Sequence, residues 1–252
     1  MYREIPCIKV DSGKFTTTRH VVVDEVPLSL TVNGRNVMTA MVSPTSLEDF
    51  TRGFLFTEQI IKSIDEIESM KVEKTAVSVM TKNPFKIVGP KKIILSGCGG
   101  SSSFLDTKRL PQITSSFTVS PELIIQAVKL VMDSELHQLT GGVHVVGLMN
   151  QGGKVCIVED IGRHNALDKA IGIAIRNHVD LSKTYVISSG RISSEMVRKC
   201  LVANIPVIVS RGATTSLAVE VAGKTGLCIV GFARGKKMNI YTNPERIEGY
   251  LP

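Results

Sequence analysis

Cys98 stands in the stretch KKIILSGCGGSSSF, where a short apolar run leads into a turn rich in glycine and serine. A structural cysteine normally lies on an apolar face as a small hydrophobe. Because Gly97, Gly99 and Gly100 surround Cys98, no neighbouring side chain covers its sulfur, and glycine lets the backbone approach a ligand closely. Cations flank the stretch on both sides, namely Lys91, Lys92, Lys108 and Arg109. Exposed thiols in a positive field are the reactive ones, so the sequence predicts a reactive thiol here.

The other cysteines stand in different settings. Cys156 lies in the apolar run KVCIVED and Cys228 in GLCIVGF, so we expect both to be buried strand residues. Cys200 falls on a predicted helix, where we expect it to be half-buried. The five cysteines, Cys7 included, are odd in number and widely spaced, and the N-terminal stretch lacks the apolar centre of a secretory signal. These features favour reduced thiols and a cytoplasmic location.

Three glycine-rich turns stand at strand ends in the second half of the chain: LTGGVH (139–144), EDIGRHN (159–165) and SSGRIS (188–193). Loops at the carboxyl ends of strands bind ligands in open α/β sheets, and helix N-termini there attract phosphate. Arg163 and Arg191 offer bidentate donors to phosphate oxygens. His164, at a helix start, could contact a ligand or handle a proton, whereas His144 is expected to be a satisfied core histidine. Together the loops favour a nucleotide-like ligand.

A basic turn follows the last predicted apolar strand. It places Arg234, Lys236 and Lys237 around Gly235. Three cations around a glycine suit a pyrophosphate, but they equally suit a solvated surface. The sequence leaves both interpretations of this turn open.

Composition disfavours several classes of function. The net charge is +7, which fits a phosphorylated ligand or an acidic partner as well as a solvated basic face. Aromatic residues make up 5% of the chain and tryptophan is absent, which disfavours nucleic-acid binding. No apolar run approaches the roughly 20 residues that span a bilayer. No Cys-x-x-Cys pair occurs, so we expect no zinc site.

Two regions with different sequence patterns must position these residues. Residues 1–118 are predicted to form a β-rich subdomain that carries the Cys98 loop. Within them RHVVVDEVPLSLTVNGRNVMTAMV (19–42) alternates apolar and polar residues around an Asn33–Gly34 hairpin signal, and a helix that Ser46 could cap is expected near 44–62. Residues 119–252 begin with a Ser120–Pro121 helix start and then follow the order α-β-β-α-β-α-β-α-β. This order predicts an α/β fold, a mixed sheet with helices on both faces.

The chain resembles the FdhD family of formate dehydrogenase accessory sulfurtransferases over most of its length. The segments that carry the resemblance are TGGVH, EDIGRHNALDKAIG, SSGRISSEM and GFARGKKMNIYTNPERI, with VDEVPLSLTVNG as a weaker N-terminal match. The resemblance implies a cytidine-deaminase-like, three-layer α/β/α domain in the C-terminal half. It also implies a sulfur carrier that takes a persulfide from a cysteine desulfurase and passes the sulfur to the molybdenum cofactor before insertion into apo-formate dehydrogenase.

The resemblance assigns site residues as well. Cys98 matches the persulfide-bearing position. The cofactor, Mo-bis-molybdopterin guanine dinucleotide, would be held as cargo through its phosphates by the basic turn and by two arginine loops, that is by Phe232, Ala233, Arg234, Gly235, Lys236, Lys237, Arg163, His164 and Arg191. No intrinsic metal, nucleic acid or membrane enters this interpretation, and the sequence leaves a homodimer open.

The chain departs from the family in its reactive loop. The family usually holds Cys-x-x-Cys there, whereas Ser101 replaces the second thiol in this chain. A one-thiol carrier remains chemically sufficient, because each transfer is attack by a sulfur nucleophile on a sulfane sulfur. The missing thiol favours an alternative, a non-catalytic chaperone that binds the cofactor and the apo-enzyme. A nucleotide-binding enzyme of deaminase-like fold is a weaker alternative, because the zinc ligands are absent.

Overall fold

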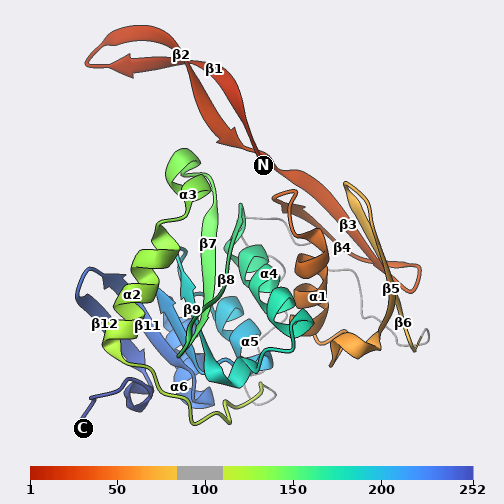
Figure 1. Cartoon of the computed structure of the whole chain (residues 1–252), viewed down its shortest axis with the longest axis vertical. Helices are drawn as coiled ribbons and strands as arrows, with labels where there is room; N and C mark the ends of the chain where they lie inside the picture. The colour runs from red at the N-terminus through yellow and green to blue at the C-terminus, as the bar shows by residue number, and fades with distance from the viewer. Residues whose placement is uncertain (84–109, 252) are drawn as a thin grey trace.

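The computed structural model describes residues 1–83 and 110–251 (Figure 1). Two sheets with their helices lie side by side, and a separate two-stranded arm projects from them. Cys98 and the apolar run KKIILS that precedes it lie outside the described residues. In the part of the chain that is described, no helix is both long and apolar enough to cross a membrane.

A six-stranded sheet forms the centre of the larger unit, with the order β12-β11-β10-β9-β7-β8. Its middle strands β9, β10 and β11 run parallel, while β7 is antiparallel to β8 and β9, and β12 is antiparallel to β11. The strands are β7 (His144–Asn150), β8 (Gly153–Asp160), β9 (Thr184–Ser188), β10 (Val207–Ser210), β11 (Cys228–Arg234) and β12 (Lys237–Thr242). The predicted mixed sheet is confirmed.

Helices cover both faces of this sheet. Along β9, Tyr185 and Ile187 pack toward α2, whereas Val186 packs into the core under α4, α5 and α6. This alternation explains why the central strands are apolar along their whole length, since both of their faces are buried. The helices of this unit are α2 (Pro121–Met132), α3 (Glu135–Thr140), α4 (Arg163–Arg176), α5 (Ser194–Val202) and α6 (Ser216–Thr225), with short 3₁₀ turns η3 (Leu181–Lys183) and η4 (Pro244–Arg246). The expected α/β/α layers are confirmed.

A four-stranded sheet and one helix form the smaller unit. The sheet has the order β4-β3-β6-β5, with β3 and β6 parallel and the other pairs antiparallel. Its elements are β3 (Val26–Val32), β4 (Arg35–Val42), α1 (Leu47–Thr57), η1 (Ile64–Glu66), β5 (Ile67–Val72) and β6 (Ala76–Thr81). Asn33 and Gly34 both have positive φ, at 50° and 75°, which is the conformation that a two-residue hairpin turn requires.

The two units meet where α1 packs on α4. A Cβ atom on Gly53 of α1 would lie 1.8 Å from the carbonyl oxygen of Asp168, and one on Gly172 of α4 would lie 1.8 Å from that of Asp49. Only glycine permits such an approach, so the two helices touch backbone to backbone. Residues 110–118, which the sequence pattern assigns to the first subdomain, contact the second: the Ile113 amide donates to the Thr225 carbonyl at 2.9 Å.

Among the described strands, β1 (Tyr2–Asp11) and β2 (Lys14–Val23) pair only with each other, and they form the arm, which projects away from both units (Figure 1). Ser12 and Gly13, both with positive φ, make the turn at its tip. Its base is tied down by the Asp24 amide, which donates to the Met1 carbonyl at 2.8 Å.

Some local expectations are confirmed and others are wrong. Ser120 caps α2 as expected, because its hydroxyl accepts from the Leu123 amide at 3.2 Å. Ser46 precedes α1 but adopts φ 50°, and its side chain makes no capping bond, so that part of the prediction is wrong. Cys200 is fully buried instead of half-buried, since α5 is packed beneath the sheet. The arm, α3 and β12 were not expected.

Candidate functional site

Three parallel strands place arginines at one edge of the central sheet. Arg191 follows β9, Arg211 follows β10, and Arg234 ends β11. The loops after β9 and β10 are joined, because the Ile192 amide donates to the Ala213 carbonyl at 3.0 Å. This edge holds the carboxyl ends of the strands, where α/β sheets bind ligands.

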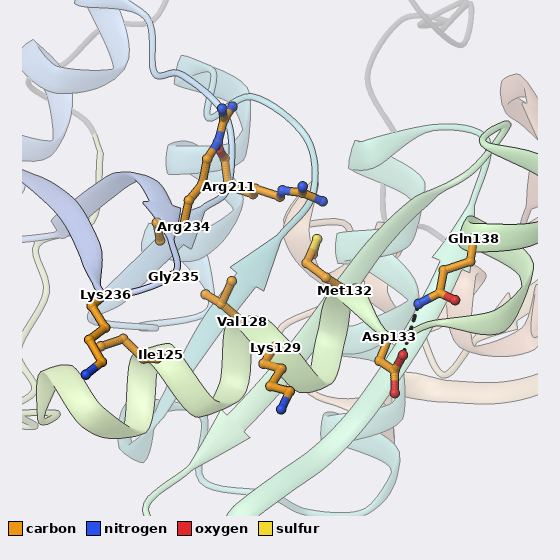
Figure 2. A pocket seen from close by; sticks show the side chains of 11 residues that line it. Ile125, Val128, Lys129, Met132, Asp133, Gln138, Arg211, Arg234, Gly235 and Lys236 are labelled. Carbon is orange, nitrogen blue, oxygen red and sulfur yellow. Dashed lines mark hydrogen bonds between the residues drawn. The ribbon is translucent and has the colours of Figure 1, made fainter.

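A pocket of about 550 Å³ lies at this edge, between α2 and the β11–β12 turn. Figure 2 shows Arg211 and Arg234 next to each other on one side of it, with the helix on the other. The lining residues are Ile125, Val128, Lys129, Met132, Asp133, Gln138, Arg211, Ala233, Arg234, Gly235 and Lys236. The volume falls in the range of small-molecule and cofactor sites.

The β11–β12 turn is held in a defined shape by its neighbours. The Phe232 amide donates to the Gly212 carbonyl at 2.9 Å, and Arg234 Nε donates to the Arg211 carbonyl at 3.0 Å. Phe232 itself has φ 51°, an unusual conformation for a bulky residue, and its exposed ring lies 5.8 Å from the Arg234 guanidinium carbon. Strained backbone of this kind is frequent near ligand sites.

The pocket is cationic with an apolar wall. Four of its side chains carry positive charge and one carries negative charge, and the apolar part comes from the inner face of α2. The single carboxylate, Asp133, accepts from Gln138 Nε2 at 3.0 Å. Such a lining suits an anionic ligand that also has an apolar or aromatic part.

A second group of polar residues, the edge cluster, lies beside the pocket and consists of His144, Arg163, His164, Ser189 and Arg191. A Cβ atom on Gly190 would come within 3.0 Å of His144 Nδ1 and 3.1 Å of Arg163 Cβ, so this loop lies directly against both side chains. The backbone of Arg191 in turn lies against Gly212, which follows a pocket residue. The edge cluster and the pocket are therefore neighbours, joined through Gly212.

Both histidines of the edge cluster favour the neutral form. Burial, with the nearby Arg163, lowers the pKa of His144, whose Nδ1 lies 3.4 Å from Ser189 Oγ. Burial and Arg163 also lower the pKa of His164 to about 3, and its Nε2 lies 3.2 Å from Ser193 Oγ. Neutral imidazoles beside arginines can accept or donate single hydrogen bonds to a bound group without adding charge.

The stretch EDIGRHNALDK also contains buried residues that hold the fold together. Asp160 lies 2.7 Å from Lys169 Nζ and accepts from the Asn165 amide nitrogen at 2.8 Å and from the Ser43 backbone amide at 3.1 Å. Asp168 accepts from Lys199 Nζ at 2.9 Å. These side chains connect the two units, and Arg163 and His164 are the members of the stretch that lie in the edge cluster.

The described cysteines differ sharply in chemical character. Burial raises the pKa of Cys156 to about 11 and that of Cys200 and Cys228 to about 12, so these three thiols stay protonated near neutral pH. Cys7 is exposed on the arm. Among the described residues, Cys7 is the one exposed cysteine, Cys156 is half-buried, and Cys98 lies outside them.

The structure brings some of the predicted site residues together and separates others. Ala233, Arg234, Gly235 and Lys236 line the pocket. The residues of the prediction that do not line it are Phe232, Lys237, Arg163, His164 and Arg191.

Sequence reasoning missed Lys129 and Arg211. Arg211 follows an apolar strand in the same manner as Arg191, so the rule of carboxyl strand ends could have found it. Lys129 had no comparable signal, because an exposed lysine on a helix is ordinary. In the described ranges, no group of three His, Cys, Asp or Glu side chains is suited to holding a metal ion.

Comparisons with known proteins agree with this architecture. Residues 23–248 match the FdhD/NarQ family model. The chain is 37% identical to a sulfur carrier protein FdhD of Wolinella succinogenes over 240 residues, covering 90% of this chain and 82% of that protein. It is 37% identical to a sulfur carrier protein FdhD of Staphylococcus aureus over 254 residues, covering 96% and 95%. A crystal structure from Desulfotalea psychrophila, provisionally described as a formate dehydrogenase accessory protein, is 29% identical, with a TM-score of 0.82 over 98% of this chain and 99% of that one.

Proposed function

The chain belongs to the FdhD/NarQ family, and from that premise we propose that it carries persulfide sulfur from a cysteine desulfurase to Mo-bis-molybdopterin guanine dinucleotide, before this cofactor enters formate dehydrogenase. The sulfur carriers named above support the first part of this proposal. The accessory protein of similar structure supports the link to formate dehydrogenase. We propose a cytoplasmic location, where thiols stay reduced.

The single observation that carries the cofactor part is the cationic pocket beside the β11–β12 turn. Arg211, Arg234 and Lys236 give it the charge to hold phosphate groups, and α2 gives it an apolar wall for the rest of a nucleotide. The neighbouring edge cluster, with Arg163 and Arg191, extends the positive surface along the same sheet edge. The cofactor has two guanine dinucleotide arms, and therefore more phosphate groups than the pocket alone would bind. The pocket and the edge cluster could each bind some of them.

The sulfur part of the proposal rests on Cys98. Its thiolate attacks the terminal sulfur of the desulfurase persulfide, so that one S–S bond forms at Cys98 while the desulfurase S–S bond breaks and its cysteine leaves as a thiolate. No second thiol of this chain is required, which agrees with Ser101 in place of a cysteine. The buried cysteines are poor competitors for the sulfur, since their high pKa keeps them as thiols.

Intact-mass measurement tests this step. After incubation with a cysteine desulfurase and cysteine, the chain should gain one sulfur atom, and the gain should disappear on reduction. Cys98→Ala should abolish the gain, whereas Cys7→Ala, which removes the exposed thiol of the arm, should keep it. A gain that survives Cys98→Ala and vanishes in Cys7→Ala would contradict the assignment.

The missing second thiol favours one rival function, a cofactor-binding chaperone that moves no sulfur. Complementation separates the two. In a strain lacking its own carrier, Cys98→Ala should fail to restore formate dehydrogenase activity if sulfur transfer is the function. A chaperone would tolerate the substitution and depend instead on Arg234 and Lys236.

A further inference from the structure

Ser43 directly follows β4 in the smaller unit, yet its amide, carbonyl and hydroxyl groups all bond to the larger unit. It is 1% exposed. The amide donates to the Asp160 carboxylate at 3.1 Å, the hydroxyl accepts from the Ile161 amide at 3.1 Å, and the carbonyl accepts from Lys169 Nζ at 3.2 Å. Buried polar contacts that satisfy one another in this way fix a single arrangement of the two partners.

These bonds hold the turn that leads into α4. Asp160 also accepts from the Gly162 amide at 2.9 Å, so its carboxylate holds the turn from within while Ser43 holds it from the smaller unit. Gly162 is the N-cap residue of α4 and has no side chain that could cap the helix. The Asn165 side chain adds a further bond between the units, because it donates to the Met41 carbonyl at 2.9 Å. The start of α4 is therefore set by contacts with the smaller unit.

Two residues of the edge cluster come directly after this turn. Arg163 is the first residue of α4 and His164 is the second. Arg163 lies against the loop at Gly190, and His164 Nε2 lies 3.2 Å from Ser193 Oγ. All members of the edge cluster belong to the larger unit, so a ligand bound by them need not touch Ser43.

We propose that Ser43 is a positioning residue for the edge cluster: it fixes the turn at residues 160–162, so that Arg163 can donate to an anionic group of the ligand. A guanidinium forms its strong paired bonds to phosphate only in a narrow geometry. A shift of the turn therefore weakens binding although Ser43 itself touches no phosphate. Because coupling between binding contacts is reciprocal, a ligand held by Arg163 also tightens the contact between the units at Ser43. This inference rests on the proposed function, since it takes the edge cluster as part of the phosphate-binding surface.

Calorimetric titration of a double-mutant cycle with GDP tests the inference. Ser43→Ala removes the hydroxyl that holds the Ile161 amide and should weaken GDP binding about fivefold, whereas Arg163→Ala removes the guanidinium and should weaken it about tenfold or more. Ser43→Ala in the Arg163→Ala background should cause no further loss, because Ser43 acts through Arg163. A merely structural role would give the same loss in both backgrounds.

Thr57→Val is the matched control for the cycle. It removes another buried hydroxyl that joins the units, since Thr57 Oγ1 donates to Asp168 Oδ1 at 2.8 Å, but this bond lies away from the turn at residues 160–162. The variant should bind GDP as the unchanged chain does. An equal loss in Thr57→Val, or additive losses in the cycle, would overturn the inference and leave the proposed function standing. If the unchanged chain binds no GDP, the phosphate part of the proposed function is wrong, and the inference falls with it.

Hydrogen exchange of the unchanged chain tests the reciprocal effect without any variant. GDP should slow the exchange of the Ser43 amide at least about threefold, because the ligand holds the turn whose Asp160 carboxylate accepts from that amide. The amides of β5, at the opposite edge of the smaller sheet from β4, should exchange as they do without GDP. Bound GDP without a change at Ser43, or with an equal change in β5, would contradict the coupling.

Discussion

Lys236 and Lys237 are adjacent cations with different positions relative to the pocket. Lys236 lines the pocket together with Arg234, whereas Lys237 begins β12 and is not part of the lining. If the pocket binds the phosphates of a guanine nucleotide, Arg234→Ala or Lys236→Ala should each weaken GDP binding about tenfold, the effect of losing one charge-assisted hydrogen bond. Lys237→Ala is the matched control and should change the affinity little. Calorimetric titration with GDP measures all three, and equal losses would argue against a defined pocket.

His164 should make the unfolding free energy depend on pH. The pKa of His164 is about 3 in the folded chain and 6.5 in the unfolded chain. Between pH 6.5 and pH 3, the imidazole is therefore protonated in the unfolded chain and neutral in the folded chain. The stability that this group contributes is therefore present above pH 6.5 and is lost as the pH falls toward 3.

Replacing the histidine removes this dependence. In His164→Asn, the difference in unfolding free energy between about pH 7.5 and about pH 5 should shrink by about 2 kcal/mol. Burial raises the pKa of Asp168 to about 6, so the stability that this group contributes changes with pH in the opposite direction. Because Asp168 is present in both the unchanged chain and the variant, its contribution cancels when the two are compared. Urea unfolding at the two pH values measures the difference. An unchanged difference would mean that His164 is protonated in the folded chain.

Residue-scale prediction from sequence depends on local rules. Arg234 and Lys236 were singled out because a basic turn after an apolar strand is visible in the sequence, and both line the pocket. Which of the three turn cations faces the pocket depends on the bulge after Gly231 and on α2, which lies about 100 residues earlier in the chain. No local pattern encodes that contact.

At the scale of elements, the packing of α1 on α4 depends on two glycines. Gly53→Ala and Gly172→Ala would each place a methyl group 1.8 Å from a carbonyl oxygen of the facing helix. The helices must then separate, and we expect a loss of about 3 kcal/mol or more in unfolding free energy. Gly223→Ala on α6 is the control, because its nearest neighbour is a side-chain methyl at 3.7 Å, and it should be neutral or slightly stabilising. Thermal unfolding that ranked all three alike would contradict the close contact.

Helices, strands and turns could be predicted where the local sequence has a specific reason to form them. The Asn33–Gly34 turn and the Ser120–Pro121 helix start have specific backbone reasons, and both elements are present. The six-residue α3 is too short to show a helical period. The strand β12 follows a basic turn and is mostly exposed, so its pattern resembled a surface loop. In the described part of the chain the arm pairs with no larger sheet, and nothing in its local sequence predicts that separation.

At the scale of the whole molecule, buried charges connect the two units. Lys169 Nζ donates to the Ser43 carbonyl of the smaller unit at 3.2 Å while pairing with Asp160. Lys199 Nζ donates to Thr57 Oγ1 at 3.0 Å while pairing with Asp168. The change in sequence pattern near residue 118 indicated two units. The contacts between them join residues more than 100 positions apart, so the sequence pattern could not predict them.

Since the smaller unit supplies hydrogen bonds to these buried ion pairs of the larger one, the two units should unfold together. Lys199→Met leaves the Asp168 carboxylate buried without its cation, which should cost about 3–5 kcal/mol. Native-state hydrogen exchange should then show equal losses of protection in β4 of the smaller sheet and β9 of the larger one, because opening either unit exposes the same charges. Lys224→Met breaks an exposed pair with Glu220 and should leave protection almost unchanged, because solvent screens such a pair. A loss confined to β9 would mean that the small sheet folds independently and that the buried charges serve α4 and α5 alone.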